Sequence, residues 1–125
     1  MAGPIKSYRD LVAWQKAIAL CKHVYAISAT FPRAERFGLI SQIRRAAVSV
    51  PSNIAEGYGR RSTGDYVRFL NIARGSVAEM VTQLVIADEL GFAAKDEVHS
   101  CIASAEEVDR IIFGLIRAVE RGGSS

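Results

Sequence analysis

Residues 42–61 read QIRRAAVSVPSNIAEGYGRR and contain four arginines, several small residues and a proline within a helical pattern. Pro51 removes a backbone donor and clashes with the carbonyl of Ala47, so we expect this helix to continue through Pro51 with a kink. Gly57 and Gly59 are expected to end it. Apolar residues at helical spacing predict its inner stripe, which consists of Leu39, Ile43, Ala46, Ala47, Val50 and Ile54.

A long helix is predicted before this stretch. Ser7 and Asp10 have the spacing of a capping box. Pro32 disfavours helical geometry in the residue before it, so the helix should stop near Thr30. Its apolar residues form two stripes. The first consists of Leu11, Trp14, Ile18, Cys21 and Tyr25, and the second of Ala17, Leu20, Val24 and Ile27.

Two further helices are predicted after it. Ser62 and Asp65 repeat the capping spacing and open a helix that ends before Gly91. Its predicted core stripe is Tyr66, Leu70, Ala73, Val77, Val81 and Leu84. A fourth helix spans about 95–121, with an inward stripe of Val98, Ile102, Ala105, Val108, Ile112, Leu115 and Val119.

Four helices joined by short loops predict an all-α, up-down four-helix bundle. The chain has 125 residues, which suits a single domain over 1–125, with a packed core over about 7–121 and a disordered tail at 122–125. It contains no apolar run of membrane-spanning length and no signal-peptide pattern, so the cytoplasm is the expected location.

Some features suggest contact with a second subunit. The third helix carries Phe69, Ile72 and Ile86 away from its core stripe. It also holds Gly75 in mid-helix, where glycine costs about 1 kcal/mol relative to alanine unless something packs against it. The second helix carries a face of small and charged residues, which are Ser41, Arg45, Ser49, Ser52 and Glu56. We therefore expect a homo-oligomer.

Positive charge is concentrated in the middle of the chain. The formal net charge is +3, but residues 33–74 hold eight arginines against three acids, a net of +5, and the remainder has a net of −2. Arginine forks onto phosphates and carboxylates and stacks on bases. We expect Arg60, Arg61 and Arg68 to form a mobile phosphate-binding cluster, because Arg60 and Arg61 follow the helix stop.

A structural role is favoured for other arginines. Glu56 and Glu79 are the acids expected to act inside the structure, each pairing with Arg44, Arg45 or Arg74 of a neighbouring helix or subunit. For Arg44 and Arg45 we favour structure over ligand contact.

Enzymatic and metal-binding roles are disfavoured by spacing. Cys21 with His23, and His99 with Cys101, have zinc-ligand chemistry, but residues two apart on a helix point in different directions. The two cysteines are better explained as free thiols in the core. We expect no enzyme activity, no metal and no cofactor, since di-iron and nucleotide-binding patterns are also incomplete.

The sequence resembles the four-helix-bundle protein family of bacterial ribosomal RNA intervening sequences, which is related to the accessory variability determinant of diversity-generating retroelements. The residues that carry this resemblance are Leu11, Trp14, Phe31, Pro32, Glu35, Phe37 to Leu39, Gln42 to Ala47, Asn53 to Gly57, Gly59, Arg60, Phe69, Leu70, Ala73, Gly75, Ser76 and Glu79. The resemblance implies a subunit that assembles into a barrel-like homopentamer, with a basic surface that engages nucleic acid or, in the retroelement branch, a reverse transcriptase and its RNA.

Two functional hypotheses follow. The first is a nucleic-acid-binding accessory protein for RNA or DNA, in which oligomerisation multiplies the charge of each subunit. The second is a protein-interaction scaffold whose arginines serve assembly or bind an acidic protein partner.

Overall fold

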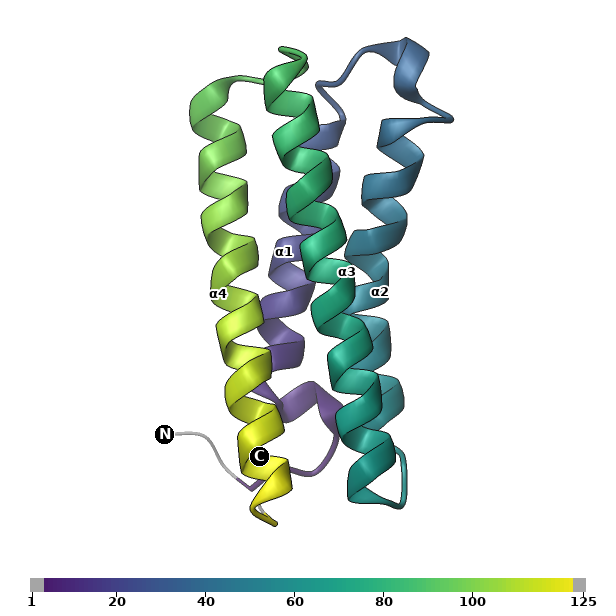
Figure 1. The fold of residues 1–125 in the computed structure, drawn as a ribbon, viewed down its shortest axis with the longest axis vertical. Coiled ribbons are helices and arrows are strands. Elements are labelled where there is room, and N and C mark those ends of the chain that lie inside the picture. Colours follow the sequence, from purple (N-terminus) through teal and green to yellow (C-terminus); the bar gives the residue numbers. More distant parts are fainter. Residues whose placement is uncertain (1–3, 123–125) are drawn as a thin grey trace.

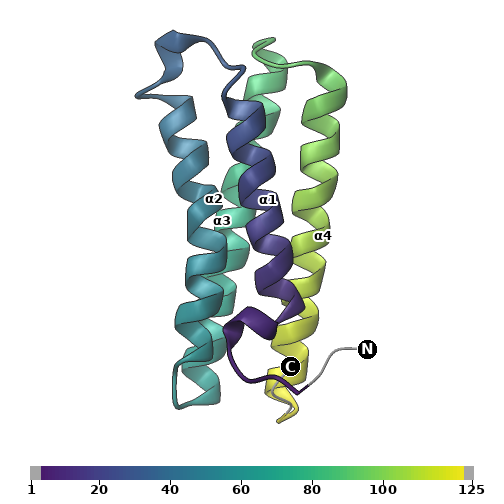
Figure 2. The ribbon, with the colours of Figure 1, turned by 180° about the vertical axis from the view of Figure 1, so that it is seen from behind.

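The structure is a computed structural model that describes residues 4–122 of the chain. Its elements are η1 (Tyr8–Asp10), α1 (Val12–Ser28), η2 (Arg33–Glu35), α2 (Leu39–Tyr58), α3 (Thr63–Glu89) and α4 (Lys95–Glu120), where η denotes a 3₁₀ helix. The four long helices alternate in direction, each packs on its chain neighbour, and α4 packs back on α1 (Figure 1, Figure 2). The predicted all-α four-helix bundle is confirmed.

The core is formed by the predicted inner stripes. Every residue of the α2 stripe is buried, and one α1 stripe, Ala17, Leu20, Val24 and Ile27, lies fully inside. Of the other stripe only Leu11 is buried, whereas Ile18 is half-buried and Tyr25 is exposed. Val81 of α3 and Ile102 of α4 are also only half-buried. The core thus follows the predicted pattern, except that the buried face of α1 is narrower than predicted.

The N-terminal capping box is present, but it caps a separate element. The Ser7 backbone N–H donates to Asp10 Oδ2 at 3.2 Å, and the Ser7 hydroxyl accepts from the N–H of Arg9 at 3.2 Å. These hydrogen bonds cap the N-terminus of η1. Leu11 then adopts extended geometry, with φ −72° and ψ 130°, before α1 begins at Val12. The predicted continuous start of the first helix is therefore wrong.

The signals at both ends of α3 are confirmed. Ser62 Oγ accepts the N–H of Asp65 at 3.1 Å, as a helix N-cap does. At the other end Gly91 takes φ 71°, which favours glycine, and the N–H of Phe92 donates to the Ala87 carbonyl at 2.8 Å. This is the Schellman arrangement that terminates many helices.

The C-terminal tail was expected to be disordered from residue 122. Gly122 instead lies in a turn after α4, with φ 88°, and its N–H donates to the Val119 carbonyl at 3.0 Å. Residues 123–125 lie outside the described part of the chain.

Helix α2 continues through Pro51, which is buried inside it. The Ser52 hydroxyl donates to the Val48 carbonyl, and the Asn53 side-chain amide donates to the Ser49 carbonyl, both at 2.8 Å. Side chains next to the proline thus bond to backbone carbonyls of the preceding turn, although neither bond reaches the Ala47 carbonyl whose helical donor Pro51 lacks. Continuity of the helix is confirmed, and the kink stays a prediction.

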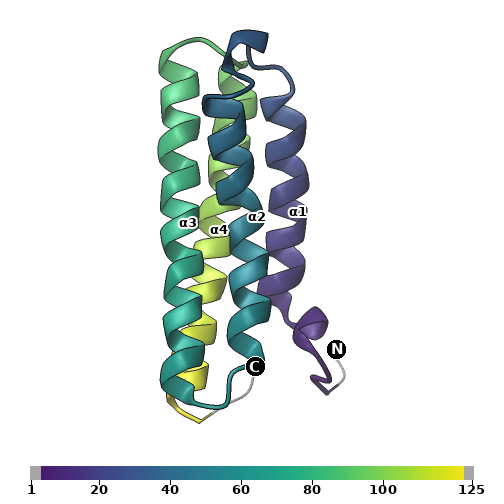
Figure 3. The ribbon, with the colours of Figure 1, turned by 90° about the vertical axis from the view of Figure 1, so that its right-hand side faces the viewer.

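Helices α2 and α3 lie in close contact at Gly57. A Cβ atom built on Gly57 would lie 2.8 Å from Phe69 Cβ and 3.2 Å from the Tyr66 carbonyl oxygen. Farther along, Ser76 Oγ donates to Ser49 Oγ at 2.8 Å. Gly57 therefore allows α3 to pass directly beside the end of α2. The α2–α3 connection, η1 and the last turn of α4 lie at the same end of the bundle (Figure 1, Figure 3).

Candidate nucleic-acid interface

Arg44 is held within the subunit by α1. Its Nε donates to Ser28 Oγ at 2.8 Å, its Nη2 donates to the Tyr25 carbonyl at 3.2 Å, and its guanidinium lies 4.5 Å from the centre of the Tyr25 ring. Ser28 is fully buried. The structural role favoured for Arg44 agrees with these contacts; it has no carboxylate partner among residues 4–122, and pairing with another subunit stays a prediction.

Arg74 has a different partner from the ones predicted. Its Nε and Nη2 donate to the two carboxylate oxygens of Asp109 on α4, at 2.9 and 3.2 Å. The hydrogen bond to Asp109 raises the pKa of Arg74 above its ordinary value. Asp109 lies 35 residues along the chain, so only the packing of α3 against α4 brings the two together.

Arg45 and Glu79 lie along one groove between α2 and α3. The groove has a volume of about 400 Å³, and its other lining residues include Ser49, Gln83 and Phe37. Neither charged side chain has an ion-pair partner among residues 4–122. Ser49 was expected to face another subunit, but it bonds to Ser76 of its own chain.

Gly75 was expected to have a close neighbour. A Cβ atom built there would meet nothing within 4 Å in this chain, because Gly75 faces outward from α3. Packing within the bundle therefore does not explain the glycine. Ile72 and Ile86, on the same helix, are also exposed, as predicted.

Arg60 and Arg68 share the ring of Phe69. Their guanidinium carbons lie 4.7 and 4.6 Å from the ring centre. Arg60 also pairs with Glu56 at 2.7 Å and Arg68 with Asp65 at 3.7 Å. We call these three residues, Arg60, Phe69 and Arg68, the arginine stack. The structure thus brings Arg60 and Arg68 to one aromatic ring, while the phosphate-binding role and the mobility of the cluster stay predictions.

Sequence reasoning placed Phe69 on an outward face without linking it to the arginines. Arg68 is its chain neighbour, so that contact had a local signal. Arg60 reaches the ring because Gly57 brings α2 and α3 together. In the sequence Gly57 indicated only a helix end, and its role in helix packing could not be read from spacing. The pairing of Glu56 with Arg60 also replaces the predicted pairing with Arg44, Arg45 or Arg74.

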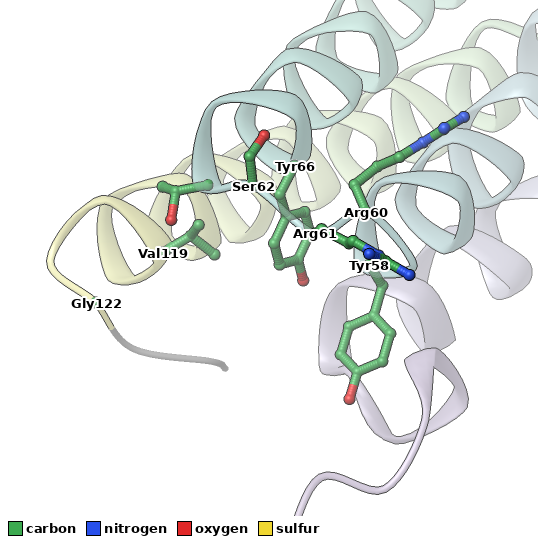
Figure 4. Close-up of a pocket in the computed structure, with 8 residues that line it drawn as sticks. Tyr58, Arg60, Arg61, Ser62, Tyr66, Val119 and Gly122 are labelled. Atoms are coloured by element: carbon green, nitrogen blue, oxygen red, sulfur yellow. The ribbon is translucent and has the colours of Figure 1, made fainter.

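Arg61 lines a separate pocket at the end of the bundle. This end pocket has a volume of about 370 Å³ and is lined by Tyr58, Arg60, Arg61, Ser62, Thr63, Tyr66, Val119 and Gly122. Figure 4 shows the Arg60 side chain extending away from Tyr66 and Val119. Arg61 is exposed and has no ion-pair partner among residues 4–122. It is therefore the arginine of the predicted cluster that no acid neutralises in the described chain.

Tyr66 lies in the same pocket with an unpartnered hydroxyl. The residue is 9% exposed, and its hydroxyl oxygen has no hydrogen-bond partner in the described chain. A buried polar group left in this state costs about 1–3 kcal/mol. Burial, together with the neighbouring Tyr58 phenol, raises the pKa of Tyr66 to about 12, so the hydroxyl keeps its proton at neutral pH.

The two cysteines are free thiols, as predicted. Cys101 is fully buried, and burial raises its pKa to about 11. Cys21 is half-buried against the core, and burial raises its pKa as well. Among residues 4–122, no group of three or more histidine, cysteine or acidic side chains has the arrangement of a metal site. No helix within that range is long and apolar enough to span a membrane.

Arg60, Arg61 and Arg68 lie at or next to the α2–α3 connection, and we call them the α2–α3 corner. The fold and this corner define a class, namely small up-down four-helix bundles with a basic α2–α3 connection. Within that class, the chain belongs to the 23S rRNA-intervening sequence protein family, whose model matches residues 9–114. The family resemblance noted from the sequence is thus confirmed.

A solved structure shares the fold. It is the crystal structure of a protein with unknown function from the S23 ribosomal protein family of Bacteroides thetaiotaomicron, and it is similar with a TM-score of 0.79 at 20% identity. The similarity covers 85% of this chain and 99% of that chain. A search of curated proteins found no match.

Proposed function

We propose that this protein is a non-catalytic, homo-oligomeric accessory protein that binds nucleic acid through the arginines of its α2–α3 corner. The observation that carries the proposal is the clustering of Arg60, Arg61 and Arg68 at one end of the bundle. These side chains lie within the segment 33–74, which has a net charge of +5. Fixed arginine charge at one end of a small protein suits binding to a phosphate backbone without sequence readout.

The acids beside the arginine stack do not argue against this proposal. The Arg60–Glu56 side chains are 41% and 55% exposed, and the Arg68–Asp65 side chains are 60% and 52% exposed. Ion pairs this exposed contribute about 0–1 kcal/mol, so a phosphate can replace the carboxylate at little cost. The stacked guanidinium groups are also already oriented, which lowers the entropy lost on binding.

Oligomerisation would strengthen such binding. A subunit with a net charge of +3 attracts nucleic acid weakly, whereas five subunits would carry +15. The exposed apolar residues Ile72 and Ile86 on α3 support self-association, and the pentamer is the assembly that the family resemblance implies. The family description refers to an intervening sequence of 23S rRNA, which makes RNA the first probe to test.

A filter-binding assay with mixed RNA at two salt concentrations tests the proposal. We expect binding at low salt that falls steeply as salt rises, because each neutralised phosphate releases counterions. Absence of binding to RNA and DNA at low salt would overturn it in favour of the scaffold function.

The scaffold function is the alternative that one observation favours. The groove between α2 and α3 contains Arg45, Glu79 and the buried side chain of Gln83, whose Oε1 has no hydrogen-bond partner in the described chain. Polar groups of this kind suit a protein partner that brings its own donors and charges, such as an acidic protein or a reverse transcriptase. In that case Arg45, Glu79 and Gln83 would bind the partner protein, and the protein would not act by binding nucleic acid.

A substitution at Gly75 tests whether this glycine serves contact between subunits or packing within the bundle. We expect Gly75→Leu to leave the bundle folded, because a Cβ atom at this exposed position would meet nothing within 4 Å, and to lower the oligomer mass measured by light scattering. Gly114→Leu is the matched control, since Gly114 on α4 is equally open and exposed. A parent protein with the mass of a monomer at micromolar concentration would contradict the oligomer.

A further inference from the structure

The end pocket is lined by hydrogen-bond donors and contains no acid. Its two charged lining residues are Arg60 and Arg61, and only Arg61 lacks an acidic partner in the described chain. In Figure 4 the Tyr66 hydroxyl points into the space between Val119 and Arg61. That hydroxyl is buried, protonated and without an acceptor. The pocket therefore offers donors for which the described chain supplies no acceptor.

The first turn of α3 adds backbone donors to the same place. Ser62 and Thr63 line the pocket, and they begin a helix of 27 residues. The Ser62 hydroxyl accepts a hydrogen bond from the N–H of Asp65, and the Ser62 carbonyl accepts one from the N–H of Tyr66. The N–H of Thr63 comes earlier in the turn and has no intrahelical acceptor, and free amides of this kind make a helix N-terminus attractive to anions.

We propose that the end pocket binds a terminal phosphate monoester of a nucleic-acid strand. This proposal depends on the proposed function and adds the chemical group that the pocket would bind. A terminal phosphate has three free oxygens and up to two negative charges, whereas an internal phosphodiester has two free oxygens and one charge. The pocket supplies three kinds of donor, namely the Arg61 guanidinium, the Tyr66 hydroxyl and the Thr63 amide at the start of α3. The monoester matches this set better.

The end of α4 forms one border of the pocket. Val119 and Gly122 of the α4 end border it on the side opposite the α2–α3 connection. The last turn of α4 carries partial negative charge that opposes an anion, so binding depends strongly on Arg61.

Binding of three short single-stranded RNAs tests this proposal. The RNAs share one sequence and end in a 5′-phosphate, a 3′-phosphate or hydroxyl groups only. We expect the full-length protein to bind at least one phosphorylated RNA about tenfold more tightly than the hydroxyl RNA, as charge-assisted hydrogen bonds to the added phosphate would give. The two phosphorylated RNAs identify which end the pocket accepts.

Tyr66→Phe removes the hydroxyl and keeps the ring. We expect it to abolish most of the preference for the phosphorylated RNA while binding to the hydroxyl RNA and the melting temperature stay unchanged or rise. Tyr8→Phe is the matched control, because Tyr8 loses the same atom at the same end of the bundle but does not line the pocket. Arg61→Gln provides a second variant that should also lose the preference.

The outcomes separate the two proposals. Equal binding of all three RNAs by the parent protein, or a preference that survives in Tyr66→Phe and in Arg61→Gln, overturns the terminal phosphate site and leaves the proposed function standing. A parent that binds only phosphorylated RNA supports the site and overturns binding along the backbone. A parent that binds none of the three overturns both.

Discussion

Replacing Gly57 by alanine is expected to lower the free energy of unfolding by roughly 1–3 kcal/mol, the range for overpacking in a close-packed interior. The new methyl group would lie 2.8 Å from Phe69 Cβ and 3.2 Å from the Tyr66 carbonyl oxygen. Neither atom lies at the end of a flexible side chain, so α2 and α3 must move apart. Urea denaturation followed by circular dichroism measures the effect.

Gly59→Ala is the control for that substitution. Gly59 has φ −80°, which alanine adopts without strain, and its nearest neighbour would be the Glu56 carbonyl oxygen at 3.7 Å. Alanine restricts the unfolded chain, so Gly59→Ala should raise the free energy of unfolding by about 0.4–1 kcal/mol. The two glycines lie two residues apart and should change stability in opposite directions. A Gly57→Ala protein as stable as the parent would show that the helices do not meet as closely as described.

Reversing charge at the α2–α3 corner should have the largest effect on nucleic-acid binding. We expect the double change of Arg60 and Arg61 to Glu to abolish RNA binding without unfolding the bundle, because both side chains are exposed. The single change Arg61→Glu should weaken binding strongly and reduce the slope of log affinity against log salt by about 0.7 for each phosphate that the protein no longer neutralises. Filter binding over a series of salt concentrations measures both quantities.

Arg33→Glu is the matched control for this experiment. Arg33 is an exposed arginine in η2, which lies at the opposite end of the bundle, so it carries the same charge change away from the corner. It should reduce affinity only slightly, through the net charge. If the double variant at Arg60 and Arg61 binds RNA as well as the parent does, the corner is not the binding surface.

Local signals allowed much of the fold to be predicted. Ser62 at the start of α3 and Gly91 after its end act through their own backbone neighbourhoods, and both were recognised from residue type and spacing. The buried stripe of α2 was also recognised, because helical periodicity places its apolar residues on one face. The start of α1 was missed, since Leu11 leaves helical geometry between η1 and α1 although its apolar side chain continues the pattern.

The candidate site was less predictable because its chemistry depends on residues from different helices. Eight arginines between residues 33 and 74 indicated a basic segment, but not which of them were already engaged. Arg74 meets Asp109 only because α3 packs on α4. Tyr66 counted as a core residue by periodicity, and its unpartnered hydroxyl became evident only with the end pocket around it.

The sequence by itself determined that this protein is a four-helix bundle of its family with a basic segment over residues 33–74, because helix periodicity, caps and charge are local properties of the chain. Only the tertiary structure decided which arginines are engaged. Arg44 bonds to Ser28 and Arg60 stacks on Phe69, whereas Arg61 remains without an acidic partner in the described chain. Side-chain partners depend on distances between helices, and close approaches such as the one at Gly57 set those distances only in the folded protein.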